Sequence, residues 1–257
     1  MNLLTVENLT VTLATGSGDA QAVRNLSFNV GHGEILGIAG ESGSGKTMTA
    51  LSMLGLLPYK GKASGSIKFD GREILASTKR EYRDIRGKEI AMIFQDPMTS
   101  LHPMLTVEVQ LTEHLRHHRK VSKAAARNSA LELLATVKIP EPASALSAHP
   151  SQFSGGMRQR IAIAMALACE PKLLIADEPT TALDVTVQAG ILKLLHQLRK
   201  DRNLSVMVIT HDLGVLSSLT DRIMIMYAGS EVESGAISDL LQNPRHPYTK
   251  GLIAALP

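Results

Sequence analysis

The sequence predicts an α/β fold with a mixed β-sheet core, an antiparallel β subdomain at the N-terminus and an inserted helical subdomain. Short apolar runs typical of buried strands occur four times, each followed by glycine-rich or polar residues. They are residues 34–39, 90–94, 172–176 and 205–210. Two strand-like segments precede the first run. Between residues 107 and about 148 the pattern is helical, which interrupts the succession of strands and predicts the insertion.

The chain length and composition fit one large domain. With 257 residues, 44% hydrophobic and 20% charged, we expect a single domain, 1–257, of a globular protein. Its core comprises residues 1–96 and 154–257, and residues 97–153 form the helical subdomain. No run of eighteen apolar residues and no signal-peptide pattern occur, so a membrane role would come through a partner. The single cysteine, Cys169, excludes an internal disulfide.

The N-terminal elements come first. Residues 3–13 read as a strand whose alternation is interrupted at Asn8, and residues 22–30 read as a second strand after a turn at 15–19. The strand at 34–39 then leads into a glycine-rich loop, and residues 65–70 form another short strand.

The glycine-rich loop fits the phosphate-loop pattern without a mismatch, between a strand and a helix over residues 47–54. Backbone N–H groups of such a loop, with the helix N-terminus, hold phosphate oxygens. We expect Lys46 to reach the β- and γ-phosphates of a nucleotide and the Thr47 hydroxyl to bind Mg²⁺. The predicted nucleotide contacts are Gly40, Glu41, Ser42, Gly43, Ser44, Gly45, Lys46, Thr47 and Met48.

The middle of the chain alternates helices and strands. Charges of both signs predict a solvated helix face over residues 78–90. Ser154, Gly155 and Gly156 open a helix that ends before Pro171. Further elements are a helix over 187–199, a short helix over 215–219, and a closing hairpin of 222–226 and 229–232.

Polar side chains follow three of the apolar strands. In parallel sheets, ligands bind beyond the carboxyl ends of the strands. Asp177 is the expected carboxylate on the Mg²⁺ side, and Glu178 is the candidate general base that polarises the attacking water. Gln95 orients this water or contacts the metal, and His211 hydrogen-bonds the γ-phosphate. This ordered set predicts nucleotide hydrolysis rather than binding alone.

With these residues in place, the chain resembles the nucleotide-binding subunit of an ATP-binding cassette (ABC) transporter, a P-loop NTPase, along its whole length. The most specific stretch is residues 153–160, Phe-Ser-Gly-Gly-Met-Arg-Gln-Arg, which is similar to the family signature. The resemblance implies that two subunits sandwich two ATP molecules. Ser154, Gly155 and Gly156 of one subunit would then contact the nucleotide of the other, and Asp184 belongs to the family's D-loop.

Residues 94–103 and 244–249 resemble the ATPases of oligopeptide, dipeptide and nickel importers. This implies an energy-coupling ATPase with ATP and Mg²⁺, on the cytoplasmic face of the membrane. The implied partners are a second, different ATPase subunit, two transmembrane permease subunits and, indirectly, an extracytoplasmic solute-binding protein, without nucleic acid. Two alternatives stay open: a soluble ABC ATPase acting on nucleic acid or ribosomes, and a non-hydrolytic regulatory module.

Three features depart from the family pattern. Leu13 stands where an aromatic residue often stacks on adenine, and Met157 replaces the last Gln of the signature. Relatives that transport peptides often continue into a cysteine-containing tail, which this sequence lacks, so it is either the short form or part of a longer one. His114, His117 and His118 suggest a metal site, but without carboxylate or cysteine partners we interpret them as structural.

Overall fold

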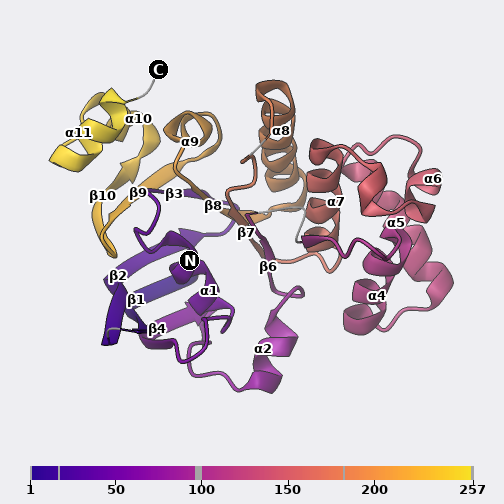
Figure 1. Ribbon diagram of the computed structural model, residues 1–257, viewed down its shortest axis with the longest axis horizontal. Coiled ribbons are helices and arrows are strands. Elements are labelled where there is room, and N and C mark those ends of the chain that lie inside the picture. Colours follow the sequence, from indigo (N-terminus) through magenta and orange to yellow (C-terminus); the bar gives the residue numbers. More distant parts are fainter. Residues whose placement is uncertain (1, 17, 96–99, 182, 256–257) are drawn as a thin grey trace. The chain divides into compact units, whose positions relative to one another are not determined.

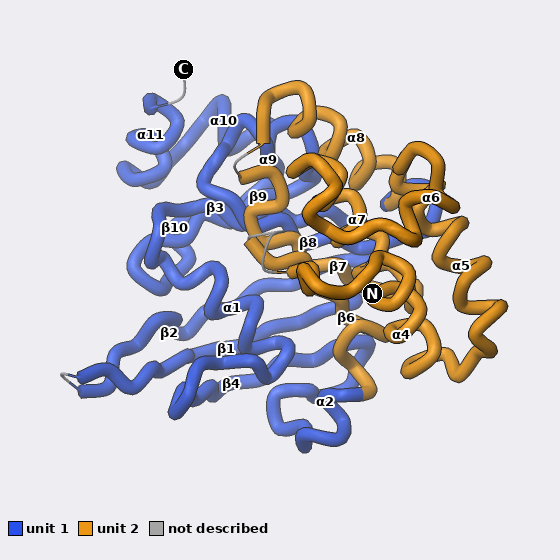
Figure 2. The backbone as a smooth tube through the Cα atoms, turned by 45° about the vertical axis from the view of Figure 1, so that its right-hand side comes forward, with its two compact units in different colours: residues 1–83, 199–257 blue, residues 84–198 orange. Residues whose placement is uncertain are grey.

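The computed structural model describes residues 2–16, 18–95, 100–181 and 183–255 (Figure 1). Residues 96–99 of the importer-like stretch and Ala182 of the D-loop therefore lie outside the described residues. The chain forms two compact units: unit 1 comprises residues 1–83 and 199–257, and unit 2 comprises residues 84–198 (Figure 2). Unit 2 contains the predicted helical subdomain, residues 97–153, but is larger. The bounds of that subdomain stay a prediction.

An antiparallel sheet in unit 1 is formed from the N-terminal strands. Its order is β2 (Gly18–Gly31), β1 (Asn2–Thr15), β4 (Lys62–Phe69) and β5 (Arg72–Glu73) (Figure 1). The break predicted at Asn8 is a β-bulge, because Asn8 has φ 51° and the pairing shifts between Val6 and Leu9. The extra residue turns both Val6 and Leu9 inward, although they are three positions apart. The predicted antiparallel subdomain is confirmed.

The second sheet segment of unit 1 is mixed, as predicted. Strand β3 (Ile35–Ala39) lies between β8 (Ser205–Thr210) and β9 (Arg222–Tyr227) and is parallel to both. Strand β10 (Ser230–Ala236) pairs antiparallel with β9. All residues of β3 and β8 are buried, which explains their continuous apolar sequences.

Four helices lie entirely within the described part of unit 1. They are α1 (Lys46–Met53), α9 (Leu213–Leu219), α10 (Ile237–Gln242) and α11 (Pro247–Ala254). Helices α1 and α9 were predicted from the sequence, whereas α10 and α11 were not. Helix α11 has Pro247 in its first turn, and the ring nitrogen Nδ1 of its N-cap residue His246 accepts from the Tyr248 N–H at 3.2 Å.

Unit 2 combines two parallel strands with a group of helices. Strand β6 (Ile90–Ile93) pairs with β7 (Leu173–Asp177). The predicted helical stretch is resolved into α4 (Val107–Arg119), α5 (Lys123–Thr136) and α6 (Pro142–Ser147), followed by the 3-10 turn Pro150–Gln152 and α7 (Gly155–Leu167). Thr106 and Ser122 cap α4 and α5 with their hydroxyl groups. Two further helices, α2 (Lys79–Ile85) and α8 (Val185–Arg202), each have residues in both units.

The start of β3 is held by a polar network. Asp221 accepts a hydrogen bond from the Ile35 N–H at 2.8 Å and lies 3.0 Å from the Arg199 guanidinium. Arg199 also donates to the Gly33 carbonyl at 2.6 Å. These bonds fix the strand that leads into the glycine-rich loop.

We predict that Asp221→Ala destabilises the protein by about 1 kcal/mol, because it leaves the Ile35 N–H and Arg199 without their shared acceptor. The melting temperature, measured by circular dichroism, should fall by about 2–4 °C. Asp201→Ala, which removes an exposed carboxylate of α8, is the control and should leave it unchanged. Equal effects of the two substitutions would contradict a role for the network.

Candidate functional site

The predicted phosphate loop has a backbone that only glycine adopts easily at three positions. Gly40, Gly43 and Gly45 have φ values of 149°, 81° and 100°. A Cβ on Gly40 would lie 2.2 Å from the Met226 carbonyl oxygen, and one on Gly45 would lie 2.4 Å from the Ala22 carbonyl oxygen. Gly43 has open space around it. Two of the glycines are therefore required by close packing as well as by their conformation.

The loop is fastened to its neighbouring strands through backbone groups. The Gly229 N–H donates to the Ser44 carbonyl at 3.1 Å, and the Arg24 N–H donates to the Gly229 carbonyl at 2.7 Å. Within the loop, the Ser44 N–H donates to the Glu41 carbonyl at 3.2 Å. The two bonds of Gly229 could not be predicted from the sequence, because they join segments that are distant along the chain.

Lys46 is buried at the start of α1, with 6% of its surface exposed. Its ammonium group donates to the carbonyls of Gly40 and Glu41 at 2.7 and 2.8 Å and lies 3.3 Å from the Ser44 hydroxyl. Among the described residues, no side chain caps α1 at Gly45 and no acidic residue stands in its first turn. The positive end of the helix and a lysine charge thus meet at one loop, which suits a phosphate group.

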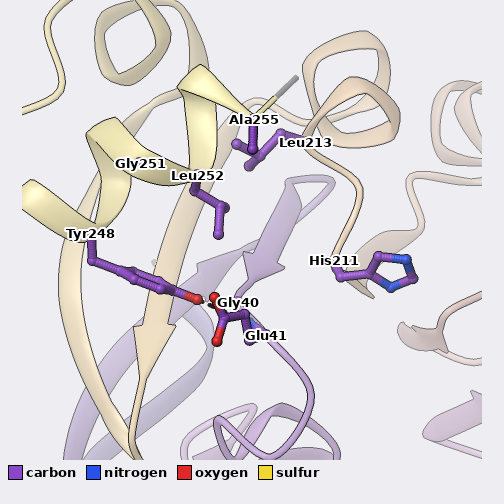
Figure 3. Close-up of a pocket in the computed structure, with 8 residues that line it drawn as sticks. All are labelled: Gly40, Glu41, His211, Leu213, Tyr248, Gly251, Leu252 and Ala255. Atoms are coloured by element: carbon purple, nitrogen blue, oxygen red, sulfur yellow. Dashed lines mark hydrogen bonds between the residues drawn. The ribbon is translucent and has the colours of Figure 1, made fainter. Parts of the chain in front are cut away.

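A cavity of about 400 Å³ opens beside the loop, between Gly40–Glu41, the start of α9 and helix α11 (Figure 3). The Tyr248 hydroxyl reaches across from α11 and accepts a hydrogen bond from the Glu41 N–H at 3.0 Å. Burial raises the pKa of Tyr248, so its hydroxyl stays protonated at neutral pH. His211 lines the same cavity, with its ring pointing away from α11 (Figure 3). Residues 244–249 were predicted to mark the subfamily, but no role was predicted for Tyr248.

Leu13 lies in β1, opposite Ala20 of β2, and is partly exposed. Its contact with adenine stays a prediction.

In unit 2, two of the predicted strand-end residues are brought together. The Gln95 amide donates to the Glu178 carboxylate at 3.0 Å. The Thr181 hydroxyl, which the sequence reading missed, donates to the same carboxylate oxygen at 2.7 Å. Glu178 has φ 48°, a left-handed conformation that is uncommon for glutamate. Asp177 ends β7 and is 3% exposed.

The signature residues begin α7. Ser154 is the N-cap, and its hydroxyl accepts from the Met157 N–H at 3.3 Å. Gly156 is packed against α8, because a Cβ there would lie 2.4 Å from Val187. Asp184 accepts from the Val187 N–H at 2.9 Å and so caps the first turn of α8. This capping role gives Asp184 a structural function besides the predicted nucleotide contact.

His114, His117 and His118 form edge-on ring contacts with centroids 4.8 Å apart. Burial lowers the pKa of His114 and of His118. The described part of the chain has no group of three or more His, Cys, Asp or Glu side chains arranged to hold a metal ion. It also has no helix with the length and hydropathy needed to cross a membrane.

Two family models match the chain. The ABC transporter model matches residues 23–181, and the model for the C-terminal region of oligopeptide/dipeptide transporters matches residues 232–257. The chain is 52% identical over 257 residues to the dipeptide transport ATP-binding protein DppD of Bacillus subtilis, covering 99% of this chain and 77% of that protein. It is also 52% identical over 255 residues to the oligopeptide transport ATP-binding protein OppD of Salmonella typhimurium, covering 99% and 76%.

Solved structures support the same fold. The ATP-binding cassette MJ0796, in a dimeric post-hydrolysis state bound to ADP and Pi, matches with a TM-score of 0.81 and 30% identity, over 91% of this chain and 98% of that one. CbiO1 from Clostridium perfringens, part of the ABC transporter complex CbiONQ, matches with a TM-score of 0.80 and 27% identity, over 94% and 91%.

The glycine geometry predicts a graded effect of alanine in the loop. Gly43→Ala should cost about 1–2 kcal/mol, because only the backbone conformation is unfavourable. Gly40→Ala should lower the melting temperature at least twice as much, since its Cβ also meets a backbone oxygen. Gly235→Ala, at a position with open space and an ordinary φ, is the control. If Gly40→Ala and Gly43→Ala lower the melting temperature equally, close packing does not constrain Gly40.

Proposed function

The chain belongs to the ABC transporter family, and from this premise we propose that it is the ATP-hydrolysing subunit that drives an importer of peptides. The observation that carries the proposal is the 52% identity along 99% of the chain to a dipeptide transport ATP-binding protein. The match of residues 232–257 to the C-terminal region of oligopeptide/dipeptide transporters supports the same substrate class. The sequence left both peptides and nickel complexes open as transported solutes, and the two relatives described above are named for dipeptide and oligopeptide transport.

In unit 1, the proposed role of the phosphate loop is to bind ATP. Its backbone N–H groups and the first turn of α1, including Met48, hold the phosphates, and Lys46 neutralises the β- and γ-phosphates. The buried, already oriented ammonium of Lys46 supports this role. His211 hydrogen-bonds the γ-phosphate, and Leu13 contacts the adenine.

In unit 2, we assign Glu178 as the general base. Its carboxylate takes a proton from water while the water oxygen bonds to the γ-phosphorus and the bond to the β–γ bridging oxygen breaks, which yields ADP and phosphate. The hydrogen bonds from Gln95 and Thr181 support this role, because they orient the carboxylate.

The residues also fit Mg²⁺. Thr47, Gln95 and Asp177 all offer oxygen atoms, which are the ligands that Mg²⁺ prefers. The buried carboxylate of Asp177 is the strongest of these donors by charge. When bound, the ion would neutralise charge on the phosphates.

The proposed assembly is a dimer of ATPase subunits, the second being a different paralogue, on the cytoplasmic face of the membrane. Ser154, Gly155, Gly156 and Asp184 contact the nucleotide held by the partner. The N-terminus of α7, without an acidic residue in its first turn, supports an anion contact there. Two permease subunits and an extracytoplasmic solute-binding protein complete the importer.

We predict that Glu178→Gln lowers ATP hydrolysis by about 10²–10⁴-fold, because an amide cannot take the proton from water. ATP binding should persist, as measured by equilibrium binding of a fluorescent ATP analogue. Glu132→Gln, which changes an exposed glutamate of α5, is the control and should hydrolyse ATP like the wild type.

Wild-type activity in Glu178→Gln would exclude Glu178 as the base. If the wild-type chain is inactive both alone and with a partner ATPase, a regulatory module is favoured. Activity only after mixing would indicate an obligate heterodimer.

The substrate assignment predicts a selective transport defect. In cells that carry Glu178→Gln in place of the wild-type chain, uptake of a radiolabelled dipeptide or oligopeptide should fall to background. Uptake of radioactive nickel should stay at the wild-type level. The reverse pattern would assign the importer to nickel, and unchanged uptake of both would favour a role outside import.

A further inference from the structure

We infer that Tyr248 of α11 is a positioning residue for Lys46, and that it acts through the peptide group between Gly40 and Glu41. The inference rests on the proposed function, since it takes ATP as the ligand of the phosphate loop. It gives the C-terminal helix a direct influence on phosphate binding.

One peptide group makes both contacts. Its carbonyl, from Gly40, accepts from the Lys46 ammonium at 2.7 Å, and its N–H, from Glu41, donates to the Tyr248 hydroxyl at 3.0 Å. A peptide group is planar and trans, so its C=O and N–H point in opposite directions and turn together. The Tyr248 hydroxyl therefore fixes the direction of the carbonyl that holds Lys46.

This peptide group needs such a partner. Gly40 has φ 149° and no side chain, so its backbone has more conformational freedom than that of other residues. On the side of α11 the loop borders the cavity of about 400 Å³ (Figure 3). The hydroxyl that crosses this space supplies the acceptor that the Glu41 N–H needs.

Tyr248 is itself held in place from two sides. Its ring packs on that of Tyr227, with centroids 4.6 Å apart. The turn before α11 is fixed by Glu233 of β10, whose two carboxylate oxygens accept from the N–H groups of Arg245 and His246 at 2.8 and 3.0 Å. Although burial raises the pKa of Glu233, its hydrogen bonds lower it below the ordinary value, so the carboxylate stays charged at neutral pH. The hydroxyl of Tyr248 thus arrives at the loop from a defined position.

The test removes only the hydroxyl. In Tyr248→Phe, the affinity of the full chain for ATP should fall about three- to tenfold, as expected for one hydrogen bond. Tyr227→Phe removes the same group from the neighbouring ring and is the matched control, with an unchanged affinity. Both affinities are measured by equilibrium binding of a fluorescent ATP analogue at a temperature where all variants are folded. Unchanged affinity in Tyr248→Phe, or an equal loss in Tyr227→Phe, would overturn the inference.

A double-mutant cycle separates positioning from general support of the fold. If Tyr248 acts through Lys46, adding Tyr248→Phe to Lys46→Ala should change the ATP affinity by less than twofold. If the fold-losses in ATP affinity of the two single variants multiply in the double variant, Tyr248 acts independently of Lys46. Failure of the proposed function would look different: the wild type would not bind ATP, or Lys46→Ala would bind it equally well.

Amide hydrogen exchange in the wild-type chain gives a measurement that does not depend on variant folding. The Glu41 N–H should exchange at least tenfold more slowly than an unprotected amide, because Tyr248 accepts its hydrogen bond. Exchange at the unprotected rate would overturn the inference.

Discussion

The buried charge of Lys46 is the constraint on which the phosphate loop of unit 1 depends. Lys46 has only 6% of its surface exposed, and a buried ammonium group is costly unless its hydrogens are bonded; the carbonyls of Gly40 and Glu41 accept these bonds. For those carbonyls to point inward, the loop must adopt conformations that exclude side chains at Gly40 and Gly45. The loop therefore holds a positive group in position for phosphate, and as a consequence Gly40 and Gly45 cannot be replaced by larger residues without strain.

Much of the fold follows from the sequence because its signals are local. The five buried residues of β3 and the glycines after it act within a few positions. Even the broken alternation at Asn8 was visible, although the bulge that causes it was not. Helix α10 was missed because it is short and has no side-chain cap. Helix α11 does begin with the local signals of a His246 cap and Pro247, but these were not used to predict a helix.

In the candidate site, too, residues with local sequence signals were predicted and residues with long-range or unmarked contacts were not. Gln95 and Glu178 were both expected at strand ends, and their hydrogen bond follows from that position. Thr181 lies only three residues beyond Glu178, but nothing local marks its hydroxyl as a partner of the carboxylate. Tyr248 was out of reach for sequence reasoning, because its contact with Glu41 spans 207 residues. Family resemblance drew attention to its stretch without giving a physical reason.

The nature of the Tyr248 contact explains why it suits adjustment of function. Any side chain at Gly40 or Gly45 would cause a severe steric clash, since a Cβ would lie 2.2 or 2.4 Å from a backbone oxygen. A single hydrogen bond contributes only about 1 kcal/mol, which changes an affinity several-fold without unfolding the loop. The phosphate loop thus combines tightly packed glycines with one weak link to helix α11.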